Sequence, residues 1–142
     1  MNMDIIKIKF LHPHAKLPIY ASNGAAGFDI FAPEDKILQE NFITKVPLGL
    51  SLEIPKGFCL LLFDRSGMAV KGIHHIGGVI DSDYRGEVSS LFFNTNSKPY
   101  IIKKDDRIVQ GLIMPVVQTL FQQVDELNIT ERGGGGFNST GK

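Results

Sequence analysis

Short apolar runs separated by turn residues most restrict what this 142-residue chain can fold into. In residues 5–10, isoleucine and phenylalanine alternate with lysine, as they do in a strand that buries one face. Similar runs recur at intervals close to the roughly 8–12 residues typical of sandwiches and barrels. The strands that we expect are residues 5–10, 28–32, 42–46, 49–54, 58–63, 87–94, 100–102 and 108–117. This pattern predicts an all-β protein.

Helix-forming residues gather in one short segment. Residues 66–71 include three good helix formers, and Ser66 is suited to cap the first turn. Gly72 then predicts the end of this helix. Residues 131–142 hold five of the 15 glycines, a composition typical of a mobile tail. We therefore expect one domain over residues 1–130 and a flexible arm over residues 131–142.

Acidic and basic residues balance in this chain. There are 15 Lys plus Arg and 15 Asp plus Glu, so the formal net charge is zero and stable nucleic-acid binding is disfavoured. No apolar stretch approaches the roughly 20 residues that span a bilayer, and the start lacks the pattern of a signal peptide. The one cysteine, Cys59, excludes a disulfide within the chain and favours a reducing compartment. We expect a soluble intracellular protein of the cytoplasm that binds no membrane.

Residues 64–67 combine features of an anion site. Arg65 stands next to Ser66 at the expected start of the helix, where backbone N–H groups lack partners in the helix. A guanidinium group and free N–H groups together suit phosphate. An ordinary helix cap beside a surface arginine would use the same residues, so this segment alone leaves both interpretations open.

Acidic and aromatic residues crowd the segment 77–87. Asp81 and Asp83 are two positions apart, so they share a face if the chain is extended there, and either could accept a proton from water. Tyr84 follows directly. A polar hairpin turn in which Gly86 takes a positive φ explains the same composition equally well.

The glycine-rich arm carries side chains suited to a nucleotide. Arg132, Ser139 and Thr140 can bind phosphate oxygens, and the glycines between them let backbone N–H groups converge on the same anion. Phe137 is an isolated aromatic residue that could stack on a nucleobase. Such an arm would become ordered when the ligand binds.

Taken in chain order with two further segments, these motifs resemble the five motifs of the trimeric dUTP pyrophosphatases, or dUTPases. The resemblance covers most of the chain, from residue 25 to residue 141. The motifs are AAGFD at 25–29, RSGMA at 65–69, GVID and DYRGE within 78–87, DRIVQ at 106–110, and RG, GGF and STG within 132–141. Each motif is weak alone, but five in order at spacing like that of the family are a strong signal.

The resemblance implies a fold, an assembly and a reaction. The fold would be an all-β jelly roll, assembled as a homotrimer whose three active sites are each built from all three subunits. The reaction would be hydrolysis of dUTP to dUMP and pyrophosphate, which limits uracil incorporation into DNA and supplies dUMP for thymidylate synthesis. Mg²⁺ would be the cofactor, held by substrate phosphates and water without a direct protein ligand. Asp29 would support the water shell of the ion.

The family's hairpin roles fall on the segment 78–87. By resemblance, Asp81 is the general base for the water that attacks the α-phosphorus. The backbone of Gly78, Val79 and Ile80 would read the uracil edge. Tyr84 would pack against the deoxyribose and leave no space for a 2′-hydroxyl group.

The phosphate-binding roles fall on two other motifs and on the arm. Ser66 and Gly67, with Arg65 nearby, would hold the α- and β-phosphates, and Gln110 would add a polar contact. Arg132, with the two hydroxyl residues of the arm, would close on the γ-phosphate while the arm's phenylalanine stacks over uracil. Closure would exclude other water and strengthen the charged contacts.

Four residues depart from the family pattern. The departures are Asp64 in place of proline, Asp105 in place of glycine, Gly111 in place of leucine and Asn138 in place of glycine. An acid at position 64 would oppose phosphate unless it turns away, and glycine at position 111 would cost packing.

Two other functions compete with dUTP hydrolysis. One competitor is a dCTP deaminase of the same superfamily. The other is a nucleotide-gated regulatory protein that signals to a partner through its arm.

Overall fold

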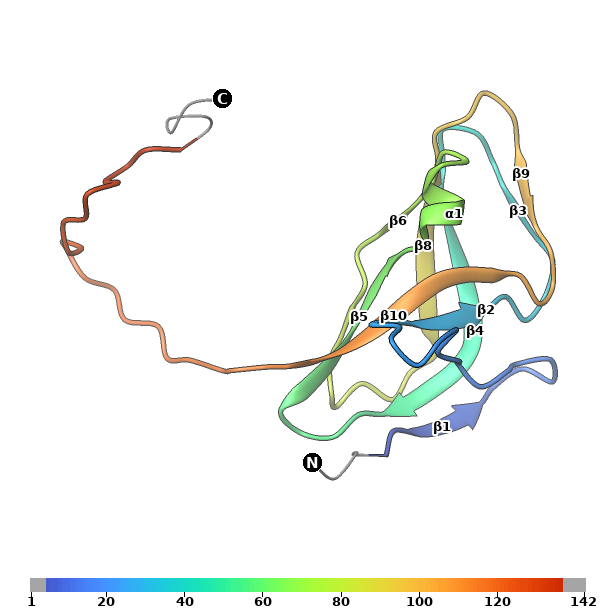
Figure 1. Ribbon diagram of the computed structural model, residues 1–142, viewed down its shortest axis with the longest axis horizontal. Coiled ribbons are helices and arrows are strands. Elements are labelled where there is room, and N and C mark those ends of the chain that lie inside the picture. The colour runs from blue at the N-terminus through green and yellow to red at the C-terminus, as the bar shows by residue number, and fades with distance from the viewer. Residues whose placement is uncertain (1–4, 137–142) are drawn as a thin grey trace.

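In the computed structural model, which describes residues 5–136, the chain forms two four-stranded sheets and one two-stranded sheet (Figure 1). The first sheet contains, in order, β1 (Lys7–Phe10), β4 (Ile43–Glu53), β8 (Val88–Asn94) and β6 (Ile73–Ile76). The second contains β2 (Phe28–Phe31), β10 (Arg107–Pro115), β5 (Phe58–Asp64) and β7 (Val79–Ile80). The small sheet pairs β3 (Lys36–Leu38) with β9 (Tyr100–Ile102), and the short helix α1 (Ser66–Ala69) follows β5.

The apolar core lies between the two four-stranded sheets. Leu60 and Leu62 of β5 point inward and are buried, while Phe63 points outward and is half exposed. From the opposite sheet, Phe92 of β8 contributes the largest fully buried side chain. Cys59 is also buried, as an apolar run around a lone thiol predicts. The prediction of an all-β jelly roll is confirmed.

Most expected strands are present within one or two residues of their predicted ends. The predicted strands 42–46 and 49–54 are one strand, β4, whose pairing with β8 shifts register between Pro47 and Leu50. The sequence pattern does not predict β3, β6 and β7. β7 has only two residues, and in β6 two histidines separate the isoleucines, so neither strand shows an alternation of apolar and polar residues.

Helix α1 is shorter than expected, and its start differs from the prediction. It ends at Ala69, and Gly72 with a φ of 74° terminates the segment as expected. The N-cap residue is Arg65, and no side chain caps the helix. The prediction that Ser66 caps the first turn is therefore wrong, because Ser66 is already the first helical residue. Among residues 5–136, no helix is long and apolar enough to cross a membrane.

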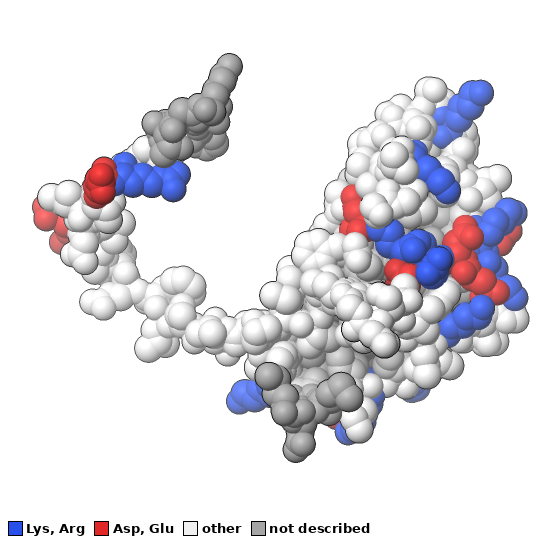
Figure 2. Space-filling model, viewed as in Figure 1, with Lys and Arg blue, Asp and Glu red and all other residues white. Residues whose placement is uncertain are grey.

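Beyond β10 the chain leaves the two sheets. Residues 116–136 contain no strand or helix and extend away from the body of the molecule (Figure 1). Leu120, Phe121 and Ile129 are 100%, 98% and 99% exposed, respectively. Residues 116–124 carry no charged side chain, and this part of the segment is uncharged in the space-filling view (Figure 2). An apolar segment that is exposed to this degree lacks the surface that would bury it.

Candidate functional site

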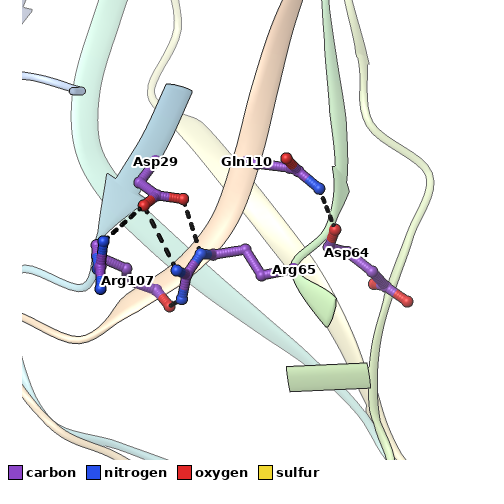
Figure 3. Close-up of polar contacts among 5 residues, drawn as sticks. All are labelled: Asp29, Asp64, Arg65, Arg107 and Gln110. Carbon is purple, nitrogen blue, oxygen red and sulfur yellow. Dashed lines mark hydrogen bonds and ion pairs between the residues drawn. The ribbon is translucent and has the colours of Figure 1, made fainter. Parts of the chain in front are cut away.

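A buried carboxylate holds two arginine side chains at one end of the second sheet (Figure 3). Asp29 of β2 is 8% exposed. Its Oδ1 accepts a hydrogen bond of 2.7 Å from Nε of Arg65, and its Oδ2 accepts hydrogen bonds from Nη2 of Arg65 at 3.4 Å and Nη1 of Arg107 at 3.1 Å. Arg65 also donates from Nη1 to the carbonyl oxygen of Arg107 at 2.7 Å. These contacts fix the orientation of Arg65 at the start of α1.

Gln110 connects the start of α1 to β10, an inner strand of the same sheet. It lies opposite Asp29 in the pairing of β10 with β2, and its Nε2 donates a hydrogen bond of 2.7 Å to the carbonyl oxygen of Asp64 (Figure 3). Gly27 packs against this side chain, because a Cβ atom there would lie 2.8 Å from Oε1 of Gln110. The structure thus brings together the predicted phosphate-binding residues Arg65 and Gln110.

The carboxylate of Asp64 turns away from this cluster (Figure 3). It accepts a hydrogen bond from the backbone N–H of His75 and lies 3.1 Å from Nδ1 of His74. The His75 ring in turn lies 2.7 Å from the hydroxyl of Ser90 through its own Nδ1. Burial lowers the pKa of His75 below its ordinary value of 6.5, although the charge of Asp64 opposes that shift. The acid that replaces the usual proline is therefore paired within the chain and points away from the predicted phosphate site.

The other two predicted phosphate-binding residues, Ser66 and Gly67, lie on the surface at the first turn of α1. A Cβ atom at Gly67 would meet no other atom within 4 Å. Packing within the chain therefore does not require a glycine at this position. The open space lets a ligand or a neighbouring molecule approach the backbone closely.

The predicted base-reading hairpin borders a cavity of about 290 Å³. Val79, Ile80, Asp81 and Tyr84 line it together. The carbonyl oxygen of Gly78 accepts a hydrogen bond of 2.8 Å from the backbone of Leu62, which places β7 beside β5. Gly78 has a φ of 99°, a conformation that residues with a side chain rarely adopt. Four of the residues predicted for the nucleoside and the reaction thus share one cavity.

Hydrogen bonds to β4 hold the turn that follows Asp81. The hydroxyl of Ser51 donates to the carbonyl oxygen of Arg85 at 2.7 Å, and Oε1 of Glu87 accepts from the backbone N–H of Gly49 at 3.0 Å. The hydroxyl of Tyr84 donates to the carbonyl oxygen of Glu87 at 3.1 Å, with its ring packed over the glycine between them. These contacts fix the position of Tyr84 on the wall of the cavity.

Asp81 also borders a second, larger cavity of about 830 Å³, together with Asp83 and Arg85. The two carboxylates face this cavity from a turn and not from an extended segment, because the backbone N–H of Tyr84 donates to the carbonyl oxygen of Asp81 at 3.2 Å. The chain is therefore not extended here, yet both carboxylates line the same cavity. Asp81 is the carboxylate that lines both cavities.

The arginine cluster, formed by Asp29, Arg65 and Arg107, lies far from the hairpin cavity of about 290 Å³ within one chain. β7 runs antiparallel to β5 with Ile80 opposite Leu60, so Asp81 lies near the start of β5, whereas Arg65 follows its end. β5 is seven residues long, and its ends are therefore about 20 Å apart. Among the described residues, the linings of the two cavities include none of the arginine cluster.

Of the predicted arm residues, Arg132 lies within the described part of the chain. Its Nε donates a hydrogen bond of 2.9 Å to the carbonyl oxygen of Gly135. The predictions for Phe137, Ser139 and Thr140, and the departure at Asn138, concern residues outside the described part.

Two departures from the family pattern have compensations in the fold. A Cβ atom at Gly111 would lie 2.5 Å from the ring of Phe28, so that ring fills the space that a side chain would otherwise occupy. The expectation that glycine costs packing here is therefore wrong. Asp105 has a φ of 72°, which explains why glycine suits this position, and its carboxylate pairs with Lys16 at 2.9 Å.

Several residues of the arginine cluster and the smaller cavity are not among the predicted site residues. Arg107 lies within the motif at 106–110, but nothing in the sequence indicates that it shares a carboxylate with Arg65. Lys45, Glu87 and Ser89 line the smaller cavity. Strand pairing brings Lys45 there from a distant segment, and no local signal could identify it.

The described residues offer little to a metal ion directly. Both oxygens of the Asp29 carboxylate already accept hydrogen bonds from arginine side chains. Among residues 5–136, no group of three or more His, Cys, Asp or Glu side chains could hold a metal ion.

Comparison with known proteins gives a consistent result. A model of the dUTPase family matches residues 13–141. The deoxyuridine 5'-triphosphate nucleotidohydrolase of Nautilia profundicola is 45% identical over 140 residues, which cover 96% of this chain and 99% of that protein. The protein of the same name from Paramecium bursaria Chlorella virus 1 is 44% identical, with 98% and 99% covered. The solved structure of a Staphylococcus bacteriophage 80alpha dUTPase mutant with dUpNHpp has a TM-score of 0.92 at 25% identity, with 99% of this chain and 100% of that chain covered.

Proposed function

This chain belongs to the dUTPase family, and we propose that it hydrolyses dUTP to dUMP and pyrophosphate by attack of water on the α-phosphorus. One observation carries the proposal beyond family membership: Asp81 borders both a cavity of about 290 Å³ and a larger cavity of about 830 Å³. The smaller cavity is close to the lower limit of about 300 Å³ for ligand pockets and suits a nucleoside. In the cell, the reaction limits uracil incorporation into DNA and supplies dUMP for thymidylate synthesis.

Asp81 is the general base in this proposal. Its carboxylate accepts a proton from water as the water oxygen bonds to the α-phosphorus. The bond between the α-phosphorus and its bridging oxygen breaks, and pyrophosphate leaves with that oxygen. Tyr84, fixed by its hydrogen bond to the backbone of Glu87, packs against the deoxyribose and excludes a 2′-hydroxyl group.

The arginine cluster binds the phosphates. Asp29 orients Arg65 through two of its nitrogens, so the guanidinium keeps its position without reorganising when the substrate arrives. Ser66 and the open backbone at Gly67 lie beside it and hold the α- and β-phosphates. Gln110 contributes a further polar contact to the triphosphate.

Mg²⁺ is the proposed cofactor. Bound to the triphosphate, the ion would neutralise phosphate charge and orient the leaving group. The occupied carboxylate of Asp29 supports binding through substrate and water without a direct protein ligand. Oδ1 of Asp29 accepts one hydrogen bond and so retains a lone pair with which it would support the water shell of the ion.

We also propose that the chain assembles as a homotrimer in which neighbouring copies complete each site. The exposed apolar residues between 116 and 129 support this, since they need a second surface to bury them. The distance of about 20 Å between the ends of β5 supports a site shared between subunits, because each copy then supplies one half of it.

The arm at residues 131–142 closes over a completed site in this proposal. Arg132 and the two hydroxyl residues at 139 and 140 bind the γ-phosphate, and the aromatic ring at 137 stacks over uracil. A chain that ends at residue 130 should keep the cooperative thermal unfolding of the full chain and lose most dUTP hydrolysis. Full activity of the shortened chain would contradict the role of the arm.

The chain's family membership and its relatives named as nucleotidohydrolases favour hydrolysis over deamination. A regulatory protein that binds nucleotide without turnover would have no need of a carboxylate at Asp81.

We propose a cytoplasmic location, because the buried Cys59 has no disulfide partner and suits a reducing compartment.

Isotope labelling tests the reaction itself. Hydrolysis of dUTP in H₂¹⁸O should place one ¹⁸O atom in dUMP and none in pyrophosphate, because water attacks the α-phosphorus. The label in pyrophosphate would show attack at the β-phosphorus instead. Release of ammonia from dCTP would support the deaminase.

Mixing two inactive variants tests the shared site. Asp81→Asn disables the hairpin half and Arg65→Ala disables the phosphate half, so each homotrimer should be inactive. Trimers formed by co-expression should regain activity, because some of their sites combine two intact halves. If each chain built its own site alone, co-expression would restore nothing.

A further inference from the structure

Ser89 carries a hydroxyl group that is buried and lacks a partner. Its neighbours on β8, Val88 and Ser90, are buried in the core, and Ser89 points to the opposite face of the sheet. Among the described residues, its Oγ atom is shielded from solvent and has no hydrogen-bond partner. A buried hydroxyl without a partner costs free energy, so such a group in a native structure calls for an explanation, of which a bound ligand is one.

Ser89 lies on the wall of the nucleoside-sized cavity, with its hydroxyl just beneath that wall. Ser89 lines the cavity of about 290 Å³ together with Val79, Ile80 and Tyr84. It pairs across the sheet with Pro47, which has no N–H group to donate, and the register of the two strands shifts just beyond that pair. The residue paired with Ser89 on the neighbouring strand therefore has no backbone N–H group to donate.

We propose that Ser89 is a further base-recognition residue, whose hydroxyl forms a hydrogen bond with the polar edge of the pyrimidine in this cavity. The pyrimidine edge of uracil carries carbonyl acceptors and an N–H donor, and a hydroxyl group pairs with either kind. The inference rests on the proposed function for the identity of the nucleotide. Since the base lies away from the reacting phosphorus, the hydroxyl contributes to substrate binding and not to the chemical step.

Binding of dUMP to the Ser89→Ala variant tests this role by calorimetry on the full chain. Loss of one hydrogen bond to the base should weaken dUMP binding about three- to tenfold and raise KM for dUTP by a similar factor, with kcat unchanged. Inhibition by inorganic tripolyphosphate, which has no base, should not change. The matched control is Ser97→Ala, an exposed serine in a loop, which should behave like the wild type.

Thermal unfolding without nucleotide separates recognition from a structural role. Because the hydroxyl has no partner in the free chain, Ser89→Ala should keep or raise Tm. A lower Tm together with weaker tripolyphosphate inhibition would identify a structural residue and overturn the proposal. Unchanged dUMP affinity would also overturn it. If the wild type fails to hydrolyse dUTP, the proposed function is wrong. If the wild type hydrolyses dUTP and Ser89→Ala binds dUMP as tightly as the wild type, only the inference about Ser89 is wrong.

Discussion

Replacing Asp29 with asparagine should damage both stability and phosphate binding. The carboxylate holds Arg65 at 2.7 Å and Arg107 at 3.1 Å from a position that is 8% exposed. Removing one partner from a buried ion pair costs about 3–5 kcal/mol. The two arginine side chains are 26% and 45% exposed and can regain hydration, so we expect about 2–3 kcal/mol. For a domain of this size, that lowers Tm by about 6–12 °C.

The same substitution should lower kcat/KM for dUTP about 10- to 100-fold, because a misplaced Arg65 no longer meets the phosphates in the reactive geometry. Calorimetry at equal protein concentration measures Tm, and steady-state kinetics measures kcat/KM. The matched control is Asp35→Asn, which removes an exposed carboxylate paired with Lys103 at 2.8 Å and should change little. If Asp29→Asn behaved like that control, the account of the arginine cluster would be wrong.

Three further substitutions give distinct outcomes. Asp81→Asn should lower kcat about 10²- to 10⁴-fold while binding dUpNHpp as tightly as the wild type, and undiminished turnover would exclude Asp81 as the base. Gly111→Leu should cost about 1–3 kcal/mol of stability because its Cβ atom would lie 2.5 Å from the Phe28 ring, and an unchanged Tm would refute that packing argument. Since burial lowers the pKa of His75, the unfolded chain binds the proton more readily, and the free energy of unfolding should fall as pH drops below 6.5. His75→Gln should flatten that dependence between pH 7.5 and 5.5. Urea unfolding at several pH values measures the free energy of unfolding, and a pH dependence as steep as that of the wild type would contradict the prediction.

Local patterns in the sequence account for most of the sheet. Leu60 and Leu62 alternate with outward residues, so their strand is predictable without knowing its partners. β6 is not predictable in this way, because two histidines separate its isoleucines and Asp64 stabilises it through the His75 backbone. That hydrogen bond depends on a residue 11 positions away.

The candidate site likewise contains residues that the sequence predicts and residues that it does not. Asp81 and Tyr84 are recognisable from a dense polar segment, and the structure places both on one cavity. Ser89 carries no such signal, and the motif that contains Arg107 does not indicate its contact with Asp29, because both features arise from strand pairing and from a cavity that only the folded chain creates. Sequence resemblance identifies motif residues, whereas the contacts that orient them depend on tertiary structure.

Pyrophosphate release from dUTP, dTTP, dCTP and UTP, assayed side by side with Mg²⁺ and then with excess chelator, measures whether this chain is a Mg²⁺-dependent hydrolase selective for dUTP. We predict release from dUTP that the chelator abolishes, with little release from the other three nucleotides. That selectivity would reflect a cavity that excludes a 5-methyl group, a 4-amino group and a 2′-hydroxyl group. No pyrophosphate from dUTP, or equal release from UTP, would contradict the account.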